Sequence, residues 1–291
     1  MIQVNARHTE PGNSGASPTP RQAAMLDILV NVDDMRDDNP AVRVGLDVAS
    51  RHNGFATGLH VVDVFPSALA LPDAVEMLAM EEREARARDA WWGELCRKRG
   101  VRGAWEVIRG IYVPLLARRS CMADITVSHL PDQKDPYPAS LNYVTRVLLA
   151  SSSPMLLVPS AWDKDFRATK ILVAWNNTPE SMRALRAALP FLREAEMVYF
   201  VDGTDEGVAG FSPPPLPVRD WLTRQGVTLH AVQQFPANNQ VGDALLDKVH
   251  GVHADLLVMG AWGHSRITEL LLGGTTRHVL ENAALPVLLA H

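Results

Sequence analysis

The chain has 291 residues, of which 47% are apolar, and it carries a formal net charge of −5. This length favours two domains with sizeable cores, and the interspersed acidic and basic residues argue against a nucleic-acid-binding surface. Because no apolar run could span a bilayer and the amino-terminal residues lack a signal pattern, we expect a cytoplasmic protein that does not bind membranes.

Residues 1–24 are rich in proline, glycine and serine, and we expect them to form a disordered extension. From residue 25 to residue 160, apolar runs of strand length alternate with helical patterns. Asn39 and Pro40 are typical of a helix cap followed by proline in the first turn. The expected strands are 26–32, 58–63, 105–108, 124–128 and 155–158, and the expected helices are 40–53, 73–99, 113–121 and 144–149. The long helix 73–99 should turn Met77, Met80, Trp91 and Leu95 toward the core.

The same order repeats from residue 170 to residue 291, where Thr178 and Pro179 form a second cap of this kind. The expected strands are 170–175, 197–201, 227–232, 256–259 and 286–289. The expected helices begin after Thr178, at 218, at 241 and after the glycines at 273 and 274, and Pro190 should kink or shorten the first of them.

An internal repeat of this kind indicates a duplicated domain, so we expect domains at 25–160 and 170–291 joined by a linker at 161–169. Strands that alternate with helices in both halves predict an α/β fold of two doubly wound, Rossmann-like, five-stranded parallel sheets in tandem. In such sheets, ligands bind at the carboxyl ends of the strands where the winding direction switches.

Two glycine clusters lie between the strand 256–259 and the last helix of this pattern. The strand 256–259 ends at Gly260 and Gly263, and nine residues later Gly273 and Gly274 precede the helix. Glycine lets the backbone approach a ligand that a Cβ would exclude, and unpaired N–H groups at a helix start favour anions. The pattern could hold a phosphate chain without lysine, although two ordinary tight turns would also explain the spacing.

The spacing Gly-x2-Gly-x9-Gly, entered from the strand ADLLVMG and followed by a helix and the strand PVLL, resembles the nucleotide loop of the universal stress protein family. The resemblance covers nearly the whole chain beyond residue 24. It implies an ATP-binding regulatory or protective protein rather than an enzyme, with Mg²⁺ supplied together with the nucleotide. Two positions depart from the family pattern: Gly274 replaces a serine or threonine, and Asn176 replaces an aspartate that contacts the nucleoside.

The resemblance also implies roles for individual residues. Asn176 and Ala174 would meet the base, Met259 would line its pocket, and backbone and hydroxyl groups would hold the ribose and phosphates. The residues expected around the ribose and phosphates are Gly260, Gly263, Gly273, Gly274 and Thr275. His264 could touch a phosphate or face solvent.

The first half lacks this loop. Alignment of the two halves places His129 opposite Gly260 and Asp132 opposite Gly263, so that side chains occupy the positions of close approach. Asn142 stands opposite Gly273. We therefore expect one nucleotide per chain, in the second half.

Two other functions are compatible with the sequence. The loss of the charged acceptor at Asn176 would suit a nucleotide-free signalling or scaffold protein of the same fold. An adenylyl transferase or a phosphotransferase would need a further constellation, and no Gly-x4-Gly-Lys-Ser/Thr loop or nucleophile–base pair stands out in the sequence. Slow hydrolysis of bound ATP remains compatible with the sequence.

The last strand of each half is apolar and should lie at a sheet edge, where it can pair with another strand. Single-domain universal stress proteins pair through this strand. We therefore expect the strands 155–158 and 287–289 to pack antiparallel, which would join the halves as an intramolecular pseudo-dimer. A homodimer of chains is compatible with this arrangement but is not required by it.

Overall fold

The computed structural model describes residues 25–64, 73–130, 141–151, 153–203, 214–234, 241–261 and 274–291. The predicted disordered extension, residues 1–24, lies outside this part of the chain. The strands are β1 (Asp27–Asn31), β2 (Phe55–Asp63), β3 (Arg102–Gly110), β4 (Ile125–Leu130), β5 (Met155–Pro159), β6 (Lys170–Trp175), β7 (Met197–Asp202), β8 (Ala231–Gln234), β9 (Leu256–Gly260) and β10 (Val287–Ala290). The helices are α1 (Pro40–Arg51), α2 (Ala74–Arg86), α3 (Asp89–Lys98), α4 (Tyr112–Ser120), α5 (Leu141–Ala150), α6 (Pro179–Glu194), α7 (Val218–Arg224), α8 (Val241–Val252) and α9 (Gly274–Asn282).

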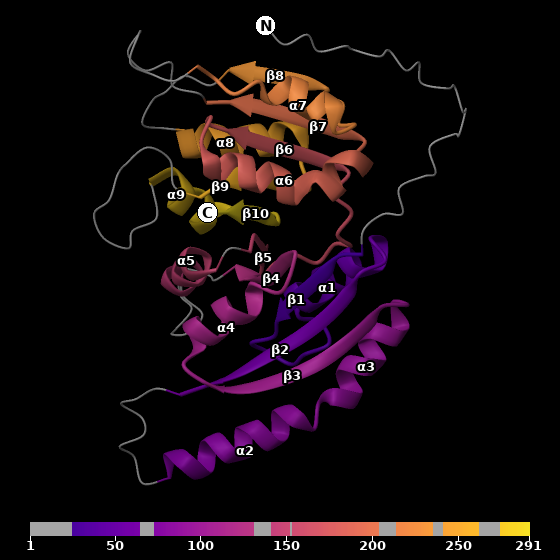
Figure 1. Ribbon diagram of the computed structural model, residues 1–291, viewed down its shortest axis with the longest axis vertical. Coiled ribbons are helices and arrows are strands. Elements are labelled where there is room, and N and C mark those ends of the chain that lie inside the picture. Colours follow the sequence, from indigo (N-terminus) through magenta and orange to yellow (C-terminus); the bar gives the residue numbers. More distant parts are fainter. Residues whose placement is uncertain are drawn as a thin grey trace, which may run out of the picture.

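The strands form one ten-stranded sheet in the order β3-β2-β1-β4-β5-β10-β9-β6-β7-β8 (Figure 1). Neighbouring strands are parallel within β1–β5 and within β6–β10. The β5–β10 pair is antiparallel, with Leu157 opposite Val287 and Leu156 opposite Leu288. This topology confirms the predicted fold class, and it confirms that the last strand of each half joins the two halves.

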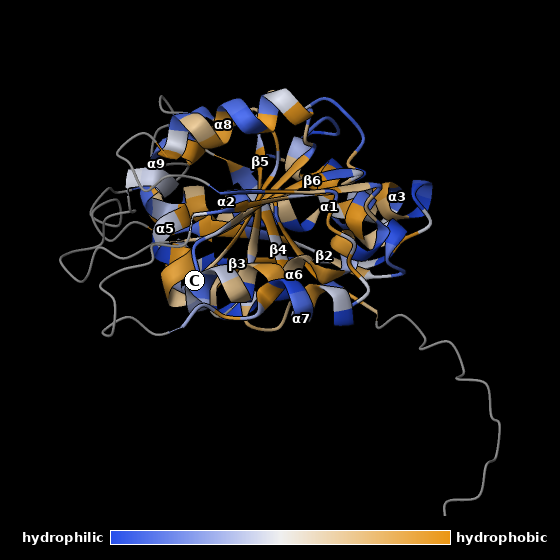
Figure 2. Cartoon of the chain, turned by 90° about the horizontal axis from the view of Figure 1, so that it is seen from above, coloured by the Kyte–Doolittle hydropathy of each residue, from blue (hydrophilic) through white to orange (hydrophobic). Residues whose placement is uncertain are grey.

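The apolar strands lie in the centre of the molecule, with helices on both faces of the sheet (Figure 2). All residues of β5 and β10 are buried, as expected for strands covered on both faces. The predicted caps are present: the Asn39 side chain accepts hydrogen bonds from Ala41 N and Val42 N, and Thr178 forms a capping box with Ser181 at the start of α6.

Contacts beyond the sheet also connect the halves. The predicted linker packs against α1: Arg43 donates a hydrogen bond to the Asp163 carbonyl at 2.6 Å, and the Asp47 carboxylate accepts one from Phe166 N at 3.1 Å. His52, which follows α1, contacts α6. Its ring lies 5.2 Å from that of Phe191 in an edge-to-face arrangement, and its Nδ1 is 3.5 Å from a Glu194 carboxylate oxygen.

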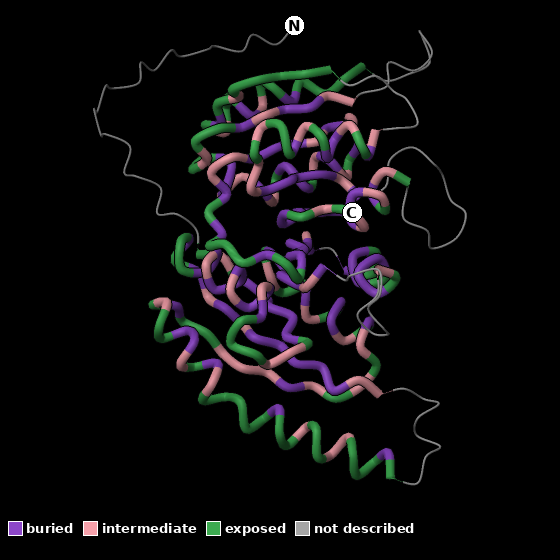
Figure 3. The backbone as a smooth tube through the Cα atoms, turned by 180° about the vertical axis from the view of Figure 1, so that it is seen from behind, coloured by how far each residue is buried: buried purple, intermediate pink, exposed green. Residues whose placement is uncertain are grey.

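The predicted single helix 73–99 is wrong in two respects. The chain forms two helices, α2 and α3, and the side chains of Met77 and Met80 are exposed rather than directed toward the core. The indole nitrogen of Trp105 donates a hydrogen bond to the Ala85 carbonyl at 2.8 Å. In a continuous helix this carbonyl would instead accept a hydrogen bond from the backbone N–H of residue 89. Helix α2 lies along the outer strand of the sheet, so most of its residues face solvent (Figure 3).

Two further expectations in the second half need correction. The third strand is Ala231–Gln234 rather than 227–232, because the backbone turns at Gly226 with φ +80° and the chain rejoins the sheet only near His230. Pro190 does not shorten α6, which continues to Glu194. The buried side chains of Phe191 and Leu192 extend the apolar stripe beyond the proline, and their burial offsets the lost hydrogen bond.

Candidate functional site

The winding direction of the sheet switches at two places, between β1 and β4 and between β6 and β9. Both pairs have the same register, since Ile28 lies opposite Ile125 in the first and Ile171 lies opposite Leu256 in the second. The carboxyl ends of these strands are therefore equivalent positions in the two halves. Open α/β sheets bind ligands at such positions.

At the second switch point, Ala174 on β6 lies directly opposite Met259 on β9. Ala174 is half-buried, and Met259 is 5% exposed. Trp175 lies between Ala174 and Asn176 in the chain, so its side chain points to the opposite face of the sheet. It is buried there, with its ring 6.2 Å from that of Phe200. The bulk of Trp175 therefore does not lie on the face of Ala174 and Asn176.

Asn176 follows β6 and is held by the cap of α6. Its Oδ1 accepts a hydrogen bond from the Thr178 hydroxyl at 2.8 Å, and Thr178 in turn caps the helix. The amide nitrogen of Asn176 makes no hydrogen bond within the described part of the chain, so it can donate one to a ligand. The side chain thus offers a donor at the edge of the sheet, while its acceptor is engaged by the protein.

Gly260 has a structural role that the sequence did not reveal. A Cβ at this position would lie 2.5 Å from the backbone nitrogen of Ser181 and 2.8 Å from the carbonyl carbon of Glu180. Glycine is therefore required because the first turn of α6 packs against the end of β9. This close approach accounts for Gly260 without a ligand, and it brings the capped end of α6 to the switch point.

Gly274 and Thr275 form the start of α9, which lies beside the ends of β9 and β10 (Figure 1). Gly274 is exposed, and a Cβ there would meet no heavy atom of the described residues within 4 Å. Thr275 is half-buried, and Thr276 is buried. Three predicted site residues, Gly263, His264 and Gly273, lie outside the described residues.

At the first switch point the equivalent positions are polar and filled. Asn31 and Ser128, both buried, replace Ala174 and Met259, and the Asn31 amide nitrogen donates to the Ser128 hydroxyl at 3.0 Å. The same nitrogen donates to the Tyr112 hydroxyl at 2.6 Å. Burial raises the pKa of Tyr112 above its ordinary value, so the phenol stays neutral.

A second tyrosine completes this packing. By the alignment of the halves, Tyr143 occupies the position of Gly274. It is buried, and its ring lies 5.6 Å from that of Tyr112 in an edge-to-face arrangement. Where the second half has a bare backbone at the start of α9, the first half has an aromatic side chain against its neighbour.

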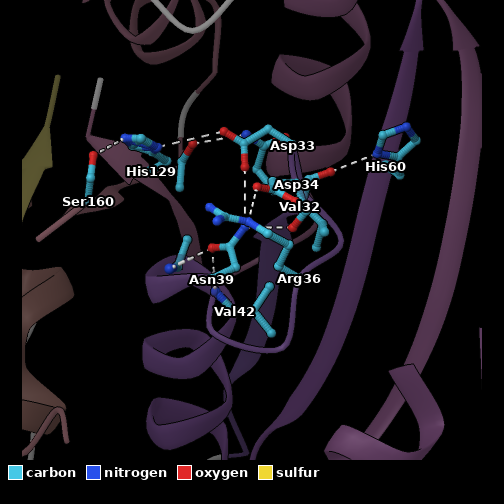
Figure 4. Close-up of polar contacts among 12 residues, drawn as sticks. Val32, Asp33, Asp34, Arg36, Asn39, Val42, His60, His129 and Ser160 are labelled. Carbon is cyan, nitrogen blue, oxygen red and sulfur yellow. Dashed lines mark hydrogen bonds and ion pairs between the residues drawn. The ribbon is translucent and has the colours of Figure 1, made fainter. Parts of the chain in front are cut away.

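The first switch point also holds a group of residues that the sequence analysis did not bring together. His129, which replaces Gly260, lies between Ser160 and Asp33 (Figure 4). Ser160 is 31 positions away from His129 in the chain, and Asp33 is still further. The pairing depends on strand register, so no local motif could have revealed it.

Comparison with known proteins finds a family similar to the second half of the chain. Residues 168–291 match the universal stress protein family. A curated relative, the universal stress protein Slr1230 of Synechocystis sp. (strain ATCC 27184 / PCC 6803 / Kazusa), is 28% identical over 147 residues. The second half of the chain is therefore similar to universal stress proteins. The match with Slr1230 covers 49% of this chain and 48% of the relative, so the chain spans about half the length of that universal stress protein.

Solved structures show the same fold over almost the whole chain. A universal stress protein from Archaeoglobus fulgidus DSM 4304 is similar with a TM-score of 0.66 and 16% identity, covering 91% of this chain and 96% of that one. A putative universal stress protein from Pseudomonas aeruginosa UCBPP-PA14 has a TM-score of 0.58 and 16% identity, covering 92% and 94%. The likeness therefore includes the first half, which lacks the glycine loop.

Two further properties concern the described residues. None of their helices is both long and apolar enough to cross a membrane. No group of three or more histidine, cysteine, aspartate or glutamate side chains among them is arranged to hold a metal ion.

Proposed function

We propose that this protein is a universal stress protein that binds one molecule of ATP per chain at the switch point between β6 and β9, and that it acts as a regulatory or protective protein rather than as a catalyst. The observation that carries the proposal is the contrast between Ala174, Met259 and Gly274 and their counterparts in the first half. A small residue, an apolar side chain and a bare helix start leave room at the strand ends. Asn31, Ser128 and Tyr143 fill the same positions in the first half.

The chemistry of these residues suits the parts of an adenine nucleotide. Met259 is a flexible, polarizable side chain that packs well against an aromatic base, and Ala174 beside it lets a flat ring lie close to the strands. The free amide hydrogens of Asn176 suit a ring nitrogen or a ribose oxygen, which are acceptors. The site thus has an apolar floor with one polar donor at its rim.

The phosphates would lie toward α9. The first N–H groups of this helix have no partners within the helix, and its dipole favours negative charge. Gly274 presents its backbone without a side chain, and Thr275 adds a hydroxyl. By family resemblance, Gly263, His264 and Gly273 belong to the same phosphate site. Mg²⁺ would arrive with the nucleotide and be held mainly by phosphate oxygens and water.

Native mass spectrometry and calorimetry with ATP test the proposal. We expect one nucleotide per chain, and we expect Gly263→Val to abolish binding because a branched side chain would occupy the space of a phosphate. Gly251→Val is a matched control, since Gly251 lies exposed on α8 with no described heavy atom within 4 Å of its added Cβ. Two nucleotides per chain would contradict the assignment to one half.

The alternative is a nucleotide-free scaffold, and one observation favours it. The side-chain oxygen of Asn176 already accepts a hydrogen bond from Thr178, and it offers the adenine amino group only a neutral acceptor in place of a carboxylate. A chain that purifies without nucleotide and shows no heat of ATP binding would support the scaffold and rule out the proposal.

A further inference from the structure

Three side chains lie in a row at the carboxyl edge of the first half. The Oγ of Ser160 lies 2.8 Å from the Nε2 of His129, and the Nδ1 of His129 lies 3.8 Å from an Oδ2 of Asp33 (Figure 4). A serine hydroxyl bonded to an imidazole whose other nitrogen faces a carboxylate is the arrangement of an activated nucleophile. Neither the family comparison nor the proposed nucleotide site in the second half uses these residues.

Neighbouring strands position the nucleophile and the base. His129 lies on β4 opposite Val158 of β5, and Ser160 follows directly after the last residue of β5. A turn bond from Trp162 N to the Pro159 carbonyl, 3.0 Å, fixes the chain on the other side of Ser160, and the Trp162 side chain is buried. Strand-borne groups keep their geometry better than groups on loops.

Asp33 is held from the other side by the cap of α1. The Asn39 amide nitrogen lies 3.4 Å from the second carboxylate oxygen of Asp33 and donates to the Asp34 carbonyl at 2.7 Å, while Asn39 Oδ1 caps the helix. The distance of 3.8 Å between Asp33 Oδ2 and His129 Nδ1 is about 1 Å too long for a hydrogen bond. Catalytic hydrogen bonds are often this long before a reactant binds, and they shorten in the complex. Asp33 is therefore a positioning residue that acts through His129.

We propose that Ser160 is a nucleophile that accepts an acyl group from an uncharged activated ester. His129 with its proton on Nδ1, facing Asp33, can take the hydroxyl proton on Nε2. Ser160 Oγ forms a bond to the acyl carbon, the bond to the leaving alcohol breaks, and His129 passes its new proton to that alcohol. The products are an acyl-serine and a free alcohol, with no oxidant or further reactant required.

The exposure and the charge of the residues around Ser160 indicate which class of acyl donor can react. Ser160 is exposed, and the side chains of His129 and Asp33 are 23% and 30% exposed, so a small donor can reach them. The segment after β1 carries four carboxylates, at positions 33, 34, 37 and 38, and a single cation, Arg36, which pairs with Asp34. This negative field disfavours acyl phosphates and other anionic donors. A neutral ester is the class that fits.

The experiment uses the full chain without nucleotide, with p-nitrophenyl acetate as the neutral donor. We expect a burst of about one nitrophenol per chain, as for an acylated nucleophile, and acetylation of Ser160 in the peptide map. Ser160→Ala should abolish this acetylation, and His129→Gln should slow it by about 100-fold or more, the usual contribution of a general base. Ser50→Ala is the matched control, because Ser50 is an exposed serine whose hydroxyl donates to the Arg99 carbonyl.

Two further arms test the positioning role and the donor class. Asp33→Asn should slow acetylation while Asp33→Glu restores most of the rate, a pattern that a purely structural role would not produce. Acetyl phosphate at equal concentration should acetylate Ser160 more slowly than the neutral ester. The proposal fails if Ser160 stays unmodified, if His129→Gln reacts at the rate of the unaltered chain, or if the anionic donor reacts equally fast.

Discussion

The two switch points of this protein have the same backbone frame and different side chains. Strand order and register correspond in the two halves. The paired residues near the strand ends, however, are Asn31 and Ser128 in the first half and Ala174 and Met259 in the second. The fold supplies an edge where a ligand can bind, and a few positions decide whether anything fits there. The function of this protein therefore has to be assigned half by half rather than from the fold.

Glycine also serves the two halves differently. In the first half, α1 approaches β1 through Gly45, where a Cβ would lie 2.4 Å from a methyl group of Val30. In the second half, α6 approaches β9 through Gly260, at the very edge where the first half has His129. A glycine needed for packing at the edge thus leaves no side chain there. The half that does not need it carries a reactive imidazole instead.

The largest expected effect is on stability, and it concerns the β5–β10 pair that joins the two halves. Leu157 and Leu288 lie in the β5–β10 pair, and both are fully buried. Leu157→Asp should cost more than about 3 kcal/mol of unfolding free energy, because an unpaired charge would be buried between the halves. Val232→Asp, on the outer strand β8 where the side chain is 40% exposed, should change stability by less than about 0.5 kcal/mol.

Urea denaturation measures both variants, and small-angle scattering shows whether the halves remain docked. Equal stabilities for the two would mean that the terminal strands do not hold the halves together.

Next in size is the packing role of Gly260. Gly260→Ala should destabilise the protein by about 1–3 kcal/mol, the cost of overpacking against the α6 backbone. Gly274→Ala is the matched control: its Cβ meets open space at the start of α9, and alanine favours the helix, so stability should hold or rise slightly. Thermal melts of the two variants decide the matter. If Gly260→Ala leaves the stability unchanged, Gly260 is not needed for packing, and its role would be ligand binding alone.

Exchanging these paired residues between the two halves tests the contrast directly. Placing the first-half residues in the second half, as Ala174→Asn with Met259→Ser, should weaken ATP binding by at least about tenfold, or about 1.4 kcal/mol. The reverse pair, Asn31→Ala with Ser128→Met, should not create a second site, since Tyr143 still occupies the place of Gly274. Calorimetry on both double variants gives the answer, and an unchanged affinity in the first would show that the base lies elsewhere.

Local sequence patterns predict the fold well where the cause is local. Apolar runs and cap residues such as Asn39 and Thr178 place most strands and helices, because periodicity and hydrogen bonding to the next turn act within a few residues. The orientation of α2 was not predictable in this way. Met77 and Met80 have the spacing of a buried face, but burial depends on which distant strand covers it, and the sheet ends at β3.

Prediction of the site is limited by the same physics. The family resemblance assigns Ala174, Asn176 and Met259 to one site, and the structure places Ala174 opposite Met259. The requirement of Gly260 for α6 and the meeting of Ser160 with His129 arise from contacts between distant segments. Spacing along the chain carries no record of such contacts.

A smaller effect should follow from restoring the family's acidic residue. Asn176→Asp should tighten ATP binding by about 1 kcal/mol, since a charged acceptor replaces a neutral one. The new carboxylate has two charged oxygens, so one could accept from Thr178 while the other accepts from the ligand. Calorimetric titration at constant pH measures the change. Weaker or unchanged binding would mean that the base does not approach residue 176.

The smallest effect concerns pH and the contact between α1 and α6. Burial lowers the pKa of His52, with the Glu194 carboxylate opposing that shift in part, so the folded state favours the neutral ring. The unfolded chain takes up this proton near pH 6.5, so the contribution of His52 to stability is present above that pH and declines as the pH falls through the lower folded-state pKa.

His52→Gln should therefore lose less stability than the unaltered chain between about pH 7.5 and about pH 5. Glu194→Gln should lose more, because it removes the carboxylate that favours the charged ring. Urea titrations at the two pH values compare the three proteins, and the same pH dependence in all of them would show that this histidine stays solvated at the junction of the halves.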